Sequence, residues 1–164
     1  MLTLAGPVAY SPFRVNALIN NINTSVNSSA VIGIRTIYVH YVSLKEHKSL
    51  DDDKTAMLTA LLDYDSKPDV SDSLTSALVD AVSSHNPSLP DNSYLLRVIP
   101  RKGTISPWSS KATNILQNCG LQDEVDRVER GLALIIQVRK GFPLDEHLGS
   151  GVFLGFIYDR MTQV

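Results

Sequence analysis

One structural unit occurs twice in this chain, and this repeat limits the possible folds more than any other feature. Each copy combines a Ser-Pro-aromatic tripeptide with a later alanine and an arginine that begins an apolar run. At an offset of 95 residues, the matching positions are Ser11-Pro12-Phe13 with Ser106-Pro107-Trp108, Ala17 with Ala112, and Arg35 with Arg130. Because the expected secondary structure repeats at the same spacing, we predict an internally duplicated, pseudo-twofold fold in which residues of about 1–44 superpose on about 94–139.

Each unit is predicted to run from strand to helix to strand. A serine followed by proline is a typical helix start, because serine caps the free N–H groups and proline suits the first helical position. The closing strand of each unit is rich in β-branched and aromatic residues, which favour strands. The expected elements are strands 2–5, 32–44, 94–99 and 125–138 and helices 12–22 and 107–118.

Residues 45–93 separate the two units and are predicted to be an acidic helical insertion. Ser49 is expected to cap a helix from residue 50 to about 62, with three aspartates in its first turn that interact favourably with the helix dipole. A second helix is expected from about 72 to 83. After the second unit, residues 152–158 are predicted to form a C-terminal strand.

Strands separated by crossing helices, without a glycine-rich nucleotide loop, indicate the α+β class. We therefore expect a two-layer sandwich, in which helices cover one face of a mixed or antiparallel sheet. A chain of 164 residues can bury a core of its own, so residues 1–164 are expected to form a single domain.

Composition and charge exclude several classes of protein. A net charge of −2 argues against a general nucleic-acid binder, and the longest apolar run, residues 132–136, is too short to cross a membrane. No signal peptide is apparent. The single cysteine, Cys119, permits no internal disulfide and is expected to be a small core residue of a cytoplasmic protein.

The stretch 100–115 holds the strongest candidate for a binding surface. Residues 92–122 contain no acidic side chain, whereas they contain the cations Arg97, Arg101, Lys102 and Lys111. A cationic turn before a helix start attracts anions or carboxylate-bearing partners. Trp108 is expected to be buried as an anchor, with Ser109, Ser110 and Lys111 facing a partner. An ordinary capped helix is the alternative interpretation.

The sequence contains no convincing catalytic group. The four histidines are far apart and lack metal-ligand spacing, and His40 lies within a predicted strand, where a structural role is expected. The remaining polar candidates, Glu129, Asp159 and Arg160, are interpreted as residues of interface ion pairs. We therefore predict no catalytic residue and no metal site in this chain.

Four motifs span nearly the whole chain. They are Leu4-Ala5-Gly6-Pro7 with Ser11-Pro12-Phe13-Arg14, the block Gly103–Thr113, Val128-Glu129-Arg130-Gly131, and Tyr158-Asp159-Arg160-Met161-Thr162. In this order they resemble the N-terminal region of the phosphoribosylformylglycinamidine synthase family in its large single-chain form. The resemblance implies a fold like a fused pair of the small accessory subunit found where this enzyme is split into separate chains.

The resemblance also implies a function. The complete enzyme is a ligase of purine biosynthesis, which uses ATP, magnesium and glutamine to convert formylglycinamide ribonucleotide to the amidine. This region would be a scaffold that docks the glutaminase and synthetase domains of the same polypeptide and covers the site of ammonia transfer. By itself it would be inactive and without a cofactor. The chain stops directly after its expected last strand, which we interpret as a cut.

A second hypothesis is a free-standing accessory domain that self-associates or binds a phosphorylated metabolite at residues 101–111. Under either hypothesis the same residues are candidates for interface or anion binding. They are Arg101, Lys102, Gly103, Thr104, Ser106, Trp108, Ser109, Ser110, Lys111, Glu129, Arg130, Asp159 and Arg160.

Overall fold

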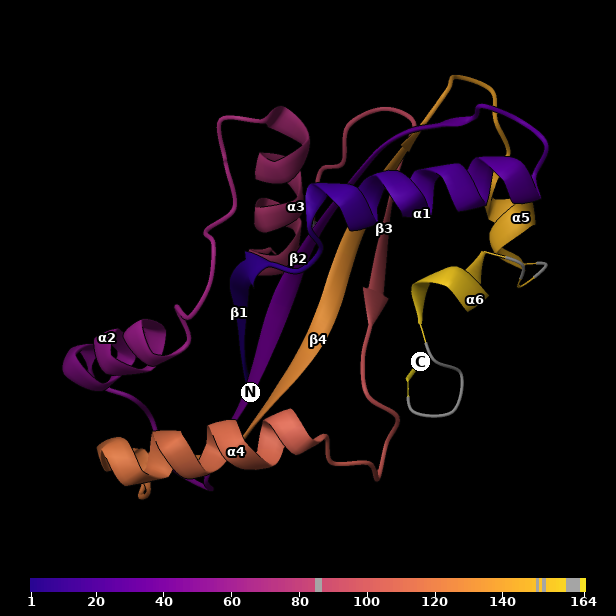
Figure 1. Cartoon of the computed structure of the whole chain (residues 1–164). Coiled ribbons are helices and arrows are strands. Elements are labelled where there is room, and N and C mark those ends of the chain that lie inside the picture. The colour runs from indigo at the N-terminus through magenta and orange to yellow at the C-terminus, as the bar shows by residue number, and fades with distance from the viewer. Residues whose placement is uncertain (85–86, 150, 152, 159–162) are drawn as a thin grey trace.

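Four strands form one antiparallel sheet in the computed structural model, which describes residues 1–84, 87–149, 151, 153–158 and 163–164. The strands are β1 (Leu2–Val8), β2 (Val31–Leu44), β3 (Ser93–Val98) and β4 (Val125–Val138), in the spatial order β1-β2-β4-β3 (Figure 1). The two central strands are paired from Val31 with Val138 to Leu44 with Val125. The α+β class is confirmed, and the sheet is antiparallel.

The two predicted Ser-Pro helix starts are confirmed. Ser11 caps α1 (Pro12–Ser25) and Ser106 caps α4 (Pro107–Leu116), each by accepting a hydrogen bond from a backbone N–H three residues later. α4 continues into the short π-helical turn η1 (Gln117–Leu121), where Gly120 has a φ of 105°. Only a glycine adopts this φ without strain, and Gly120 therefore ends the helix.

The insertion contains two helices, as predicted, but Ser49 does not cap the first. α2 (Asp52–Leu61) is capped by Asp51, whose carboxylate accepts a hydrogen bond from the Lys54 N–H at 2.8 Å. α3 (Ser73–Ser83) is capped by Asp72. Aspartate is as good a helix cap as serine, and its position next to the first helical residue decided between the two.

Helices cover both faces of the sheet, so the prediction of helices on one face was wrong. Leu134 and Ile136 of β4 pack with α1 residues, whereas the alternate side chains Ala133 and Ile135 pack with α3. Val128, on the Leu134 face of the strand, packs with Leu116 of α4. Consecutive strand residues point to opposite faces, and β4 is apolar on both, so each face requires a covering helix.

The prediction of a C-terminal strand at residues 152–158 was also wrong for the residues of this range that the structure describes. Residues 144–149 form α5 (Leu144–Gly149), and residues 154–157 form the single turn α6 (Leu154–Ile157). Nearly every residue of this segment is apolar, so periodicity could not distinguish a strand from a helix. The place next to the end of β3 is taken by Val164, which exchanges two backbone hydrogen bonds with Ile99.

The topology agrees with the predicted duplication, which stays a prediction. β1-α1-β2 and β3-α4-β4 have the same order of elements, and both central strands have 14 residues. α1 and α4 cross the same face of the sheet near its two ends (Figure 1). Within the described part of the chain, no helix has the length and apolar character needed to cross a membrane.

Candidate functional site

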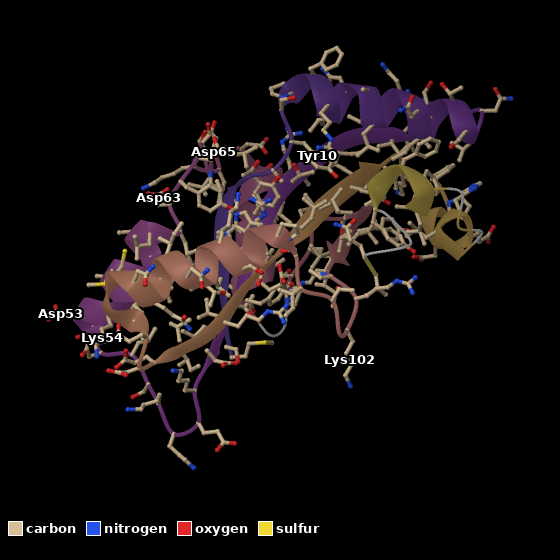
Figure 2. All side chains as sticks on the ribbon, turned by 60° about the horizontal axis from the view of Figure 1, so that its bottom comes forward. Tyr10, Asp53, Lys54, Asp63, Asp65 and Lys102 are labelled. Carbon is tan, nitrogen blue, oxygen red and sulfur yellow. The ribbon has the colours of Figure 1, made fainter. Side chains whose placement is uncertain are left out.

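The turn before α4 is an exposed surface, as predicted. Gly103 has a φ of 87°, and the Thr104 hydroxyl donates a hydrogen bond of 2.6 Å to the Arg101 carbonyl, which closes the turn. Lys102 extends away from the body of the protein (Figure 2). The predicted site residues that the structure leaves exposed here are Arg101, Lys102, Gly103, Thr104, Ser110 and Lys111.

Glu129 of β4 holds this turn through an internal network. Its carboxylate accepts hydrogen bonds from the Ser106 hydroxyl at 2.8 Å and from Arg127 Nη2 at 2.7 Å. Burial alone would raise the pKa of the Glu129 carboxyl. Hydrogen bonds from the Arg130 N–H, Ser106 and Arg127 outweigh the effect of burial, so the pKa is lowered. The ion pair expected of Glu129 is therefore made within the chain, with Arg127.

Ser109 does not face a partner, so that prediction was wrong. The side chain is fully buried, and its hydroxyl donates a hydrogen bond of 2.6 Å to the Val128 carbonyl. The Ser109 hydroxyl oxygen also accepts a hydrogen bond from Arg127 Nε at 3.2 Å. Ser109 and Leu116 are seven residues apart, so they share the helix face that packs on the sheet.

Ser106 has one structural role more than its counterpart Ser11, which leads to a matched prediction. Ser11→Ala removes only a cap, with an expected loss of about 1 kcal/mol in the free energy of unfolding. Ser106→Ala also removes a hydrogen bond to the Glu129 carboxylate, so the expected loss is about 2 kcal/mol. Urea unfolding of both variants measures the difference. Equal losses would show that the Glu129 contact contributes nothing.

Trp108 anchors the start of α4, although it is only partly buried. Its ring stacks on His40 of β2 at a centroid distance of 5.5 Å, and the guanidinium of Arg130 lies over the Trp108 ring and over the ring of Tyr38. Arg130 is 4.1 Å from the centroid of the Tyr38 ring and 4.7 Å from that of Trp108. The predicted residues Trp108 and Arg130 are thus brought together, and sequence analysis had not connected them with Tyr38 or His40.

His40 is a buried histidine with a neutral side chain at pH 7. Burial, followed by the nearby Arg130 charge, lowers the pKa of its imidazole to about 4. The ring lies against Gly6 of β1, where an added Cβ would be 2.7 Å from His40 Cε1. Nε2 is 3.1 Å from the hydroxyl oxygen of Tyr64, which also accepts a hydrogen bond from Arg130 Nη1 at 3.2 Å. The structural role predicted for His40 fits this environment.

An open cleft of about 790 Å³ lies between the starts of α1 and α4, over the centre of the sheet. Arg14 enters it from the first turn of α1, with its guanidinium 3.8 Å above the Tyr10 ring. Arg130 enters it from β4. In the part of the chain that the structure describes, neither arginine forms an ion pair. Arg14 was not among the site residues predicted from the sequence.

Asp159 and Arg160 lie outside the described residues. Cys119 is exposed rather than part of the core, because it lies in η1 beyond the last residue of α4 that packs on the sheet. Among the described residues, no three side chains of His, Cys, Asp or Glu come together as metal ligands.

Comparison with known proteins decides the family. Residues 37–164 match the family described as formylglycinamide ribonucleotide amidotransferase N-terminal. The chain belongs to this family. It is also similar to phosphoribosylformylglycinamidine synthase of Saccharomyces cerevisiae, with 52% identity over 164 residues. That alignment covers 98% of this chain but 12% of the relative, so the chain spans about an eighth of that protein's length. The resemblance carried by the four motifs is confirmed.

Proposed function

We propose that this chain is the non-catalytic N-terminal domain of a cytoplasmic phosphoribosylformylglycinamidine synthase, where it docks the glutaminase domain against the synthetase domain. The family match supports this proposal, since the relative carries a corresponding region within a much longer polypeptide. The complete enzyme consumes ATP and glutamine to convert formylglycinamide ribonucleotide to the amidine. ATP and magnesium bind in its other domains, and the duplicated halves of this domain correspond to a fused pair of small accessory subunits.

The structure of the turn is the observation that favours docking. Ser106, Ser109 and Glu129 use their side chains in hydrogen bonds within the chain, and these contacts stiffen the base of the turn. The cations and Ser110 stay exposed above this base. A rigid support under an exposed cationic surface suits recognition of a partner, because the base of the turn loses little conformational freedom when the partner binds.

The test of this function uses the complete enzyme with Ser110→Ala and Lys111→Ala. Both side chains are exposed, so the melting temperature should stay nearly unchanged, with stability shifts of about 0.5 kcal/mol or less. The amount of amidine formed per glutamine hydrolysed should nevertheless fall, because the two active sites are less firmly joined. Lys140→Ala, a second exposed lysine outside the turn, is the control and should leave this ratio unchanged. Normal coupling in both test variants would contradict the docking role of the turn.

Binding of a phosphorylated metabolite at residues 101–111 has less support. Phosphate sites combine cations with hydroxyl and N–H donors, but the hydroxyls of Ser106 and Ser109 already donate to Glu129 and Val128. The backbone N–H of Ser109 is likewise used, by the Ser106 cap. If this alternative held, ribose 5-phosphate would bind at the turn and protect it from proteolysis in the complete enzyme. Limited proteolysis with and without ribose 5-phosphate tests this expectation.

A further inference from the structure

The described lining of the cleft between α1 and α4 carries positive charge without an acidic side chain to balance it. Arg14 and Arg130 both line it, and its described lining includes no aspartate or glutamate. α1 and α4 have no acidic residue in their first turns, whereas α2 has Asp52 and Asp53 there. The start of a helix is its positive end, so Arg14 in the first turn of α1 is placed unfavourably for stability. The arrangement therefore favours an anionic occupant.

Aromatic rings hold both arginines in position. Arg14 stacks on Tyr10, and Arg130 lies over Tyr38 and Trp108. Stacking uses the face of a guanidinium and leaves the N–H groups at its edge available, in the planar arrangement that matches a carboxylate. Arg130 also donates to Tyr64 through Nη1, which further limits its movement.

Exposed apolar side chains at the cleft indicate a protein segment rather than a small ion. Ile105 is 62% exposed and Phe156 is 44% exposed, and both line the cleft with the arginines. A phosphate or a free carboxylic acid would leave these side chains in water. A peptide could cover them and bring acidic groups to the arginines at the same time, as in interfaces that combine apolar and arginine contacts.

We propose that this cleft receives an acidic segment from another domain of the same polypeptide. Acidic side chains of that segment pair with Arg14 and Arg130, and its apolar side chains pack on Ile105 and Phe156. This inference rests on the proposed docking function and adds to it the place and the chemistry of one contact.

Photo-crosslinking in the complete enzyme tests the inference. The aromatic photo-reactive residue p-benzoylphenylalanine replaces Phe156, and the crosslinked peptide is identified by mass spectrometry. We expect a peptide from beyond residue 164 that contains Asp or Glu. Arg14→Gln and Arg130→Gln should each lower the crosslink yield by about fivefold or more, the effect of losing one important interface side chain. Arg139→Gln, an exposed arginine outside the cleft, is the matched control and should not lower it.

Arg14→Gln is the more informative variant, because the side-chain contact described for Arg14 is with the Tyr10 ring alone. Loss of that contact should not disturb the fold. Once the peptide is known, Arg14→Glu combined with an acid-to-arginine change in that peptide should restore the yield. A crosslink only within residues 1–164, to a second copy of the chain, or to a peptide without acidic residues would overturn the inference. Yields unaffected by both arginine variants would overturn it as well.

A second probe separates failure of this inference from failure of the docking function. The same photo-reactive residue is placed at Lys111, on the exposed surface of α4 and outside the cleft. If Lys111 crosslinks to another domain but Phe156 does not, docking stands and the cleft assignment is wrong. If neither position crosslinks to another domain, both proposals are wrong.

Discussion

Phe153→Ala is expected to lower the free energy of unfolding by about 3–5 kcal/mol, whereas Phe156→Ala should lower it by about 1 kcal/mol or less. The two phenylalanines lie three residues apart at the C-terminal helical turn. Phe153 is fully buried, and Phe156 is 44% exposed. The pair therefore compares the same chemical change with and without the creation of a cavity.

The large effect follows from what Phe153 contacts. Its ring belongs to the cluster that contains Leu18 and Ile22 of α1 and Leu144 of α5, and it makes an edge contact with His147 at a centroid distance of 5.8 Å. Removing it would leave a void between α1 and the C-terminal segment, which close packing elsewhere in the cluster cannot fill. Urea unfolding followed by circular dichroism measures both variants. Similar losses in the two would show that Phe153 does not hold this segment to the core.

The stability of the chain is expected to fall as the pH drops from about 6.5 to about 4, and His40 should cause roughly 3 kcal/mol of that fall. The folded imidazole has a pKa of about 4, against 6.5 in the unfolded chain, because it is buried and next to Arg130. Between these two pH values the unfolded state binds the proton and the folded state does not. Acidification therefore favours unfolding, and the loss is complete below the folded pKa.

The groups around His40 explain why protonation is unfavourable in the fold. Arg130 is already a cation there, and it donates a hydrogen bond to the Tyr64 hydroxyl, which is the polar partner of His40 Nε2. Trp108 covers the face of the imidazole ring. His40→Gln keeps a polar group for Tyr64 but cannot titrate. Its stability should be lower at pH 7.5, and it should fall less steeply between pH 6.5 and 4. Unfolding free energies across this range test the slope, and parallel curves for the two proteins would contradict the assignment to His40.

Part of the candidate site could be predicted from the sequence. The Ser106 cap, the exposed Lys102 and Lys111, and Trp108 as an anchor depend on a few neighbouring residues in one helix start. The burial of Ser109 was missed, because it depends on how α4 is rotated against β4. Tyr64 and Arg14 were missed for a similar reason, since they come from segments far from α4 in the sequence and lie near it only in the folded chain.

The sequence by itself determined the order and type of most elements. Both Ser-Pro helix starts, the two central strands and the two insertion helices follow from caps, β-branched residues and apolar periodicity, which act within about one turn of helix or a few strand residues. The tertiary structure decided which faces of the sheet are covered, that residues 154–157 are helical, and that Arg14 and Arg130 share a cleft. These outcomes depend on contacts between distant segments, where the packing of two apolar sheet faces outweighs local preference.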